Sequence, residues 1–297
     1  MNRYQAFMQR LEDGDRILID GATGTEIERR GVPMVDNAWN SGGALTHPEI
    51  VRQVHEDYIR LGAQVVITNT FSTSRHVLQD AGMEEHFEML NRRGVELARE
   101  ARSNMKAPDV LVAGGITHEV FTHQDLSSSQ LQVNFEDQAA ILAAAGADLI
   151  LLEMMTDIEP MLILIEAAQK TGLPVWVGFS CNLDEDSLPH LLAGPTLLEG
   201  IEAIKGKNVP LVFIMHTEVE YIQACLDVLQ ANWEGPVGVY AHSGKFVAPN
   251  WIFDDTISPE EYASAAKPWV ERGVQVVGGC CGIGVEHIAV LKEVVEQ

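Results

Sequence analysis

The chain has 297 residues, 46% of them hydrophobic and 21% charged, a globular composition that suffices for one large domain or two small ones. Its 43 acidic and 20 basic residues give a formal net charge of -23, which argues against nucleic acid and anionic membranes as partners because both are bound through Lys and Arg. Four cysteines are too few for a disulfide scaffold, and no run approaches the roughly 20 apolar residues of a membrane span, so we expect reduced thiols in a soluble, cytoplasmic protein.

Eight short apolar runs recur along the chain and predict eight β-strands. The runs are nearly continuous in apolar residues, as at Val65-Val66-Ile67. Such continuity is typical of parallel strands that are buried on both faces. The predicted strands span residues 16–20, 65–71, 110–117, 149–154, 175–181, 211–216, 237–243 and 274–281.

Segments with a helical period separate these runs. Thr46 is a plausible cap for the first of them, and Gly146 and Gly172 stand where two others end. Eight strand–helix units favour an α/β fold of the (β/α)8 TIM barrel type, although a doubly wound sheet produces similar local patterns. No linker interrupts the alternation, so we expect a single domain over residues 1–297. The predicted helices span residues 48–61, 87–102, 135–145, 158–170, 197–204, 219–229, 260–271 and 285–296.

Polar residues stand at or beside the carboxyl ends of the predicted strands. In a barrel these ends line the mouth of the active site, so the side chains there can meet even when they are distant in sequence. Some strand-end polar residues only satisfy loop backbone. The candidates are Asp20, Asn69, Thr117, Glu153, Cys181, His216, Tyr240, His242, Cys280 and Cys281.

Two adjacent cysteines follow the last predicted strand, in the run Gly278-Gly279-Cys280-Cys281-Gly282. Thiolates are strong zinc ligands, and flanking glycines allow a turn tight enough to direct neighbouring sulfurs at one ion. The same pair could be buried packing or a strained disulfide. A zinc site needs further ligands from elsewhere in the chain.

Three motifs in this order resemble the zinc-dependent homocysteine S-methyltransferase family, which includes S-methylmethionine-dependent and betaine-dependent enzymes, and the resemblance extends from about residue 15 to 295. It implies a (β/α)8 barrel in which zinc binds the thiol of homocysteine and presents it as a thiolate to a methyl donor. The motifs are Asp20-Gly21-Ala22-Thr23-Gly24-Thr25, Ile67-Thr68-Asn69-Thr70-Phe71 after Leu61-Gly62-Ala63, and the run around the cysteine pair.

The resemblance implies three catalytic metal ligands, of which Cys280 and Cys281 match two. The third position carries His216, where the family has a cysteine. Imidazole is a good zinc ligand, so a site with two cysteines, one histidine and an open position for the substrate sulfur is chemically reasonable. Its charge would be zero rather than the -1 of three thiolates on zinc. Cys181, which also ends a predicted strand, is the alternative third ligand.

The resemblance also implies substrate-binding residues. Glu153 matches the glutamate that holds the amino group of homocysteine, although a structural salt bridge is an alternative role. Asp20 and Gly21 belong to the glycine-rich turn after the first predicted strand. Asn69 and Thr70 match pocket positions, but an asparagine that bonds to loop backbone would look the same.

Two predicted loops depart from the family pattern, at residues 115–119 and 240–245, and they leave the methyl donor and the acceptor open. The function hypothesis is methyl transfer from a small sulfonium or ammonium donor to homocysteine, forming methionine, or to a related thiol. The alternatives are a different thiol or selenol acceptor, a demethylase, and a zinc-bearing barrel that only binds a ligand. No oligomerising C-terminal arm is recognised, which favours a monomer.

Overall fold

The computed structural model describes residues 1–35, 38–118, 126–247, 250–252 and 256–296. Eight of its strands form one parallel sheet. Glu119 of the predicted loop 115–119 lies outside the described residues. The strands of the sheet are β1 (Ile17–Leu18), β2 (Val65–Ile67), β3 (Leu111–Ile116), β4 (Leu149–Met155), β5 (Val175–Phe179), β8 (Val212–Glu218), β9 (Val237–His242) and β12 (Val276–Val277).

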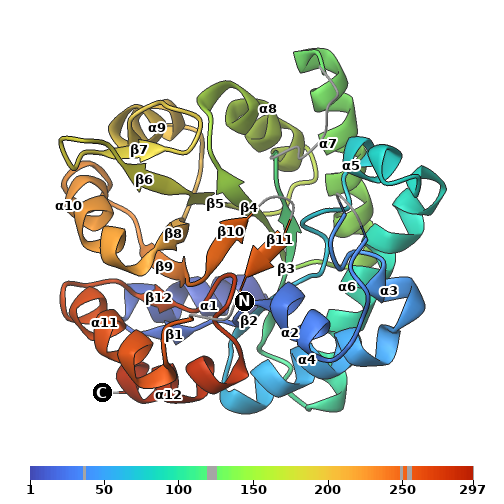
Figure 1. Ribbon diagram of the computed structural model, residues 1–297, viewed down its shortest axis with the longest axis horizontal. Helices are drawn as coiled ribbons and strands as arrows, with labels where there is room; N and C mark the ends of the chain where they lie inside the picture. The colour runs from blue at the N-terminus through green and yellow to red at the C-terminus, as the bar shows by residue number, and fades with distance from the viewer. Residues whose placement is uncertain (36–37, 119–125, 248–249, 253–255, 297) are drawn as a thin grey trace.

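The sheet closes on itself. Its strand order is β1-β12-β9-β8-β5-β4-β3-β2, and the parallel bridge between Ile19 and Val65 joins the first strand of this order to the last. Helices surround the strands on all sides (Figure 1). The (β/α)8 barrel predicted from the sequence is therefore confirmed, and each of the eight predicted strands overlaps one strand of the barrel.

The eight predicted helices are also found, although three of them begin at other residues, one of these, the helix expected at 260, only one residue earlier at Pro259. The helix expected at 135 begins at Ser128, because Ser127 and Gln130 form a capping box that starts it earlier. The helix expected at 219 begins at Ile222, after a short 3-10 turn. The corresponding helices are α4 (Pro48–Leu61), α6 (Phe87–Asn104), α7 (Ser128–Ala145), α8 (Ile158–Gln169), α9 (Leu197–Ile204), α10 (Ile222–Asn232), α11 (Pro259–Glu271) and α12 (Val285–Val295), with the turn η2 (Val219–Tyr221).

Several elements were not expected from the sequence, and apart from α1, which has ten residues, they are too short to show a clear hydrophobic period. Four of them form two antiparallel pairs, β6 with β7 and β10 with β11. The elements are α1 (Arg3–Glu12), α2 (Thr23–Arg29), α3 (Gly43–Thr46), α5 (Arg75–Asp80), η1 (Glu84–His86), β6 (Cys181–Leu183), β7 (Pro189–Leu191), β10 (Lys245–Val247) and β11 (Asn250–Ile252). No helix among the described residues is long and apolar enough to cross a membrane.

The core has two layers. One lies between the sheet and the helices, and the other fills the inside of the barrel. Helix α1 joins the inner layer, since the Phe7 ring lies 5.5 Å and the Tyr4 ring 6.2 Å from the ring of Trp176. The first helix therefore closes the amino-terminal end of the barrel, which leaves the carboxyl ends of the strands for function.

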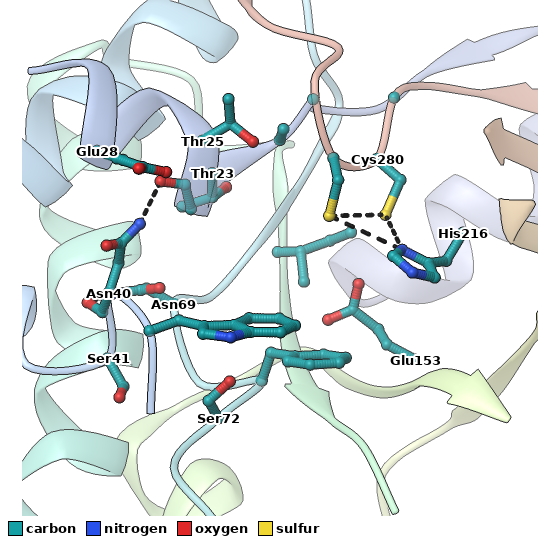
Figure 2. A pocket seen from close by; sticks show the side chains of 18 of the residues that line it. Thr23, Thr25, Glu28, Asn40, Ser41, Asn69, Ser72, Glu153, His216 and Cys280 are labelled. Carbon is teal, nitrogen blue, oxygen red and sulfur yellow. Dashed lines mark hydrogen bonds between the residues drawn. The ribbon is translucent and has the colours of Figure 1, made fainter. Parts of the chain in front are cut away.

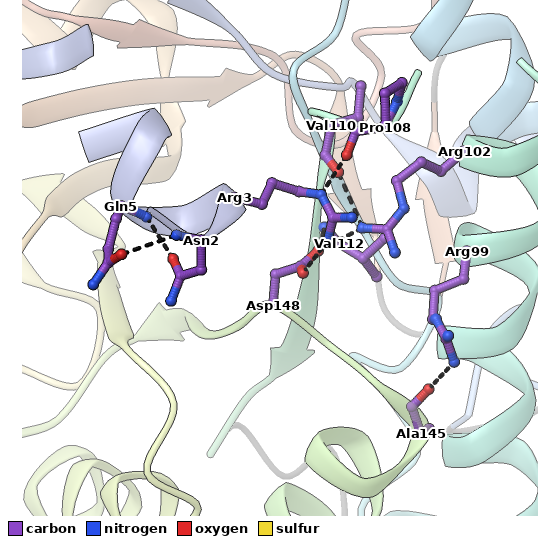
Figure 3. Close-up of polar contacts among 10 residues, drawn as sticks. All are labelled: Asn2, Arg3, Gln5, Arg99, Arg102, Pro108, Val110, Val112, Ala145 and Asp148. Carbon is purple, nitrogen blue, oxygen red and sulfur yellow. Dashed lines mark hydrogen bonds and ion pairs between the residues drawn. The ribbon is translucent and has the colours of Figure 1, made fainter. Parts of the chain in front are cut away.

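A charged cluster fastens this helix to the barrel (Figure 3). Asp148, just before β4, accepts hydrogen bonds from Arg3 Nη1 at 2.6 Å and from Arg102 Nη1 at 2.7 Å. Its carboxylate also accepts from the backbone N–H of Val112 at 2.8 Å. The side chains of Asp148 and Arg102 are only 16% and 11% exposed, so this pair is shielded from water.

Removing the central carboxylate should therefore destabilise the fold. We expect Asp148→Ala to lower the free energy of unfolding by about 2–4 kcal/mol, because it leaves the Arg102 guanidinium half-buried without its counter-charge. Chemical denaturation measures this difference. Asp15→Ala is the matched control, since the pair of Asp15 with Arg10 is 46% and 44% exposed and should contribute less than about 1 kcal/mol. Equal effects of the two substitutions would contradict the assignment.

Candidate metal centre and substrate cavity

The cysteine pair lies in a tight turn that follows β12. A Cβ atom on Gly279 would come within 2.2 Å of the Ile283 side chain, and Gly282 has φ +80, so glycine is needed at both positions. The turn is fastened to β9. Cys280 N–H donates to the Ala241 carbonyl at 2.8 Å, and the Cys281 carbonyl accepts from Ser243 at 2.9 Å. These bonds hold the two cysteines at the carboxyl ends of the strands.

His216 reaches the cysteines because the end of β8 is irregular. The pairing of β8 with β9 shifts register between Met215 and Glu218. Within this bulge His216 has φ 43, in the left-handed region that residues other than glycine rarely adopt. Such strain is kept where the surrounding structure enforces it, and it is common at functional sites. The side chain of His216 is buried.

The ligand atoms of the three residues lie close together (Figure 2). His216 Nδ1 is 3.5 Å from Cys280 Sγ and 3.8 Å from Cys281 Sγ, and the two sulfurs are 4.0 Å apart. Zinc with bonds of about 2.3 Å to sulfur and 2.0–2.1 Å to nitrogen, in tetrahedral geometry, would separate the sulfurs by about 3.8 Å and sulfur from nitrogen by about 3.5 Å. The triad therefore has the dimensions of a tetrahedral site with one position left over.

The structure does not bring Cys181 into this group. Among the described residues, only His216, Cys280 and Cys281 form a cluster of three candidate ligands. Cys181 is buried in the layer between sheet and helices, where it interacts with the buried Cys225 of α10. The alternative third ligand is therefore wrong, because the side chain of Cys181 faces the helices and not the mouth of the barrel. Cys225 is itself a fully buried core residue.

The Cys280 thiol resists ionisation on its own. The Cys281 thiol and burial raise the pKa of Cys280 well above its usual range, while His216 partly opposes the shift. Without a cation, Cys280 is therefore a neutral thiol at physiological pH. A divalent ion would reverse this preference, since coordination deprotonates a thiol. The donor set thus fits a thiophilic metal such as zinc.

A cavity of about 960 Å³, counted with its open mouth, has the triad in its wall. Glu153 also lines it, and Figure 2 shows Glu153 on the same side as His216 and Cys280. Thr23 and Glu28 lie on the opposite side in this view. The cavity thus presents polar groups on two sides.

Glu153 is a buried carboxylate at the end of β4. The register of β4 with β5 shifts beyond Leu152, and Met154 has φ 59, so this strand ends in an irregularity like that of β8. Burial raises the pKa of Glu153 to about 8, and Tyr240 opposes the shift. A Cβ atom on Gly115 would lie 2.6 Å from Glu153 Oε2, so glycine there provides the room that the carboxylate occupies.

The other four expected substrate residues divide into two groups. Gly21 and Asn69 line the cavity, whereas Asp20 and Thr70 are not among its lining residues. Asp20 is buried, with Oδ2 accepting from Ile67 N–H at 2.7 Å. Its Oδ1 has no hydrogen-bond partner among the described residues.

Thr70 has a supporting place in the structure. It is fully buried, and its hydroxyl donates to the Gly115 carbonyl at 2.8 Å. This bond lies beside the position where Gly115 adjoins the Glu153 carboxylate. Asn69, in contrast, reaches the cavity and donates to the Asn40 carbonyl at 2.9 Å.

An aromatic pair in the cavity wall was not expected from the sequence. The rings of Trp39 and Phe71 are stacked, with centroids 5.5 Å apart and an interplanar angle of 6°. Phe71 stands at the end of a predicted strand, but Trp39 lies in a segment for which the sequence predicts no element. Among the described residues, the lining contains two carboxylates, Glu28 and Glu153, and neither Lys nor Arg. The cavity is therefore suited to cationic ligands.

Comparison with known proteins agrees with the resemblance seen in the sequence. The model of the homocysteine S-methyltransferase family matches residues 17–295. The chain is 29% identical to the homocysteine S-methyltransferase of Escherichia coli (strain K12), over 95% of this chain and 96% of that protein. It is 26% identical to a selenocysteine Se-methyltransferase of Brassica oleracea var. italica, over 91% and 86% of the two chains. The metallated crystal structure of the homocysteine methyltransferase MmuM from Escherichia coli superposes with TM-score 0.81 at 28% identity, covering 98% of this chain and 99% of that one.

The raised pKa of Glu153 has a measurable consequence. Between pH 4.5, the ordinary pKa of a glutamate, and about 8, the folded protein binds a proton at Glu153 that the unfolded chain has released. Stability in the metal-free protein should therefore fall as the pH rises through this range, by up to about 1.4 kcal/mol per pH unit from this group. We expect Glu153→Gln to abolish that loss, so the free energies of unfolding of variant and wild type diverge in favour of the variant. Parallel pH profiles would contradict the assignment.

Proposed function

The chain belongs to the homocysteine S-methyltransferase family, and from this premise we propose that it transfers a methyl group from a small cationic donor to the thiol of homocysteine, forming methionine. We assign the metal to zinc, with His216, Cys280 and Cys281 as its ligands. The observation that carries the proposal is the separation of these three ligand atoms, 3.5 to 4.0 Å, in the wall of the cavity.

The open position of the triad accounts for the choice of a thiol acceptor. A catalytic zinc site has three protein ligands and leaves a fourth position for substrate or water. When bound, zinc holds the acceptor sulfur as a thiolate at neutral pH. The two cysteines and the histidine would hold such an ion in the cavity wall, so that the acceptor sulfur would lie inside the cavity and open to the donor.

Two carboxylates support recognition of the acceptor as an amino acid. Glu153 lines the cavity, and the unpartnered Oδ1 of Asp20 is a buried acceptor close enough for the Glu153 charge to raise the pKa of Asp20. An ammonium group placed between them would receive charge-assisted hydrogen bonds and would favour the ionised form of both. The cost of burying these carboxylates is thereby offset only when a cation is bound.

Another part of the cavity wall supports a cationic methyl donor. The stacked rings of Trp39 and Phe71 offer aromatic faces to a sulfonium or quaternary ammonium group, and Glu28 adds a negative charge. In the transfer step the acceptor sulfur attacks the methyl carbon in line with the leaving group. The new bond to sulfur forms as the methyl–sulfonium or methyl–ammonium bond breaks, and the donor departs as a neutral thioether or amine.

A selenol acceptor is the second candidate, because a relative at 26% identity is a selenocysteine Se-methyltransferase. The same ligand set and ammonium site would serve selenocysteine. Competition between homocysteine and selenocysteine for one methyl donor separates the two acceptors by their kcat/KM values.

The proposal predicts one zinc ion per chain and methionine as a product. Labelled homocysteine would be offered with S-methylmethionine, betaine, a sulfoniopropionate and a methylated folate. We expect His216→Ala, Cys280→Ala and Cys281→Ala each to lose zinc and to lower methyl transfer by at least about 10³-fold, because an incomplete site cannot hold the thiolate.

Cys181→Ala is the matched control, since it removes a buried thiol outside the triad. It should retain one zinc ion per folded chain. A wild type without zinc, or a Cys280→Ala variant that keeps it, would contradict the metal assignment. Zinc-loaded protein that methylates no thiol with any donor would contradict the proposed activity.

Donor recognition by the aromatic pair predicts a selective kinetic effect. We expect Trp39→Leu to raise the KM of the cationic donor by about 2- to 30-fold, the range that cation–π contacts contribute, while the KM of homocysteine stays unchanged. Trp39→Phe retains an aromatic face and should lie close to the wild type. An equal rise in both KM values would show that Trp39 acts on the whole cavity and not on the donor.

A further inference from the structure

His216 and His242, two positions that differ from the pattern implied by the family resemblance, are in contact with each other. The resemblance implies a cysteine at position 216, and His242 lies in the segment 240–245. Their rings pack with centroids 4.6 Å apart and an interplanar angle of 43°. We propose that His242, anchored by Glu218, is a positioning residue that holds the imidazole of His216 in the orientation required of a metal ligand. The inference rests on the proposed zinc site and extends it beyond the three ligands.

The register of the two strands creates this arrangement. Met215 pairs with Tyr240, and the next pairing joins Glu218 to His242. Two residues of β8 thus stand opposite one residue of β9, and His216 is one of them. Because the bulge advances Glu218 to the level of His242, Glu218 Oε1 lies 3.3 Å from His242 Nε2. The Nε2–H group can donate to this carboxylate, which fixes the plane of the His242 ring.

His242 supports both the ring and the backbone of His216. Besides the ring contact, it interacts with the main chain of His216, the residue with φ 43. Its side chain is 9% exposed, so the contact is shielded from water, while Glu218 is 40% exposed. A left-handed histidine persists only where neighbours over-determine it. We assign part of that restraint to His242.

The need for such a support follows from the change of ligand. A cysteine directs its sulfur with one side-chain torsion and can ligate through any of its lone pairs. An imidazole ligates through one in-plane lone pair, so the ring plane must point at the ion, and neighbouring groups that orient it change metal affinity by about 10–100-fold. Replacing cysteine by His216 creates this requirement, and His242 with Glu218 meets it.

Zinc affinity of the full-length protein, measured by competition with a chelator, tests the proposal without reference to activity. We expect His242→Ala to weaken zinc binding by about 10–100-fold and Glu218→Gln to weaken it less, in the same direction. The absorption spectrum of the cobalt-substituted protein should also change in His242→Ala, because the ligand field depends on the direction of the imidazole. His242→Phe keeps the ring packing but lacks the hydrogen bond to Glu218. Its zinc affinity should therefore lie between those of the wild type and His242→Ala.

A double-mutant cycle with His216→Cys separates positioning from general damage. In the His216→Cys background the third ligand needs no ring support, so adding His242→Ala should change zinc affinity by less than about 2-fold. An equal loss in both backgrounds, or wild-type affinity in His242→Ala, would overturn the inference. Should His242→Ala fail to fold, His242→Phe takes its place in the cycle. A wild-type protein that binds no zinc would instead contradict the proposed function.

Discussion

The site depends on the closure of the barrel, which makes β8, β9 and β12 neighbours. Strand β9 is their common support. On one edge, main-chain hydrogen bonds of Ala241 and Ser243 hold the cysteine turn. On the other edge, β9 pairs with the irregular end of β8 that carries His216. Three ligand atoms separated by up to 65 positions in sequence are thus placed to within 4.0 Å by main-chain hydrogen bonds. A change of one residue in the register of β8 would move the imidazole away from the sulfurs.

The buried carboxyl groups of the site lower the stability of the fold but favour the binding of a cationic ligand. Glu153 has its pKa raised to about 8 and Asp20 has a buried oxygen without a partner, which are features that folding alone would not favour. Such local violations are expected at functional sites. The proposed ligands, an ammonium-bearing acceptor and a cationic donor, carry the charges that these groups lack. A cationic ligand, which stabilises the ionised form of these carboxyl groups, would therefore bind in preference to an anionic one.

The sequence predicted the barrel because its signals are strong and local. The helix at residues 48–61 was placed correctly at both ends, but the expected cap was wrong, because Thr46 ends α3 and His47 is the N-cap residue. Gly62 adopts the left-handed conformation that ends the helix. The triad followed from strand ends and the family resemblance. Side-chain direction did not, because it depends on the pleat: Cys181 and His216 both follow apolar runs, but only His216 faces the mouth. The bulges that reorient Glu153 and His216 depend on pairing between strands, which hydrophobic pattern does not report.

The replacement of a thiolate by His216 alters the charge of the proposed centre, and the neighbourhood offers compensation. Zinc with two thiolates and a neutral imidazole has zero charge, one unit less negative than the site of the family. Glu218 carries a negative charge near the imidazole of His216. Its Oε1 lies 3.3 Å from Nε2 of His242, whose ring packs on that of His216. Because the Glu218 carboxylate is partly exposed, solvent screens its charge. It therefore replaces only a fraction of the negative charge that a third thiolate would place on the metal. The acceptor thiolate should therefore be held somewhat more tightly and attack somewhat less readily than on a site with three cysteines, so that the proposed ligand set would require a reactive donor.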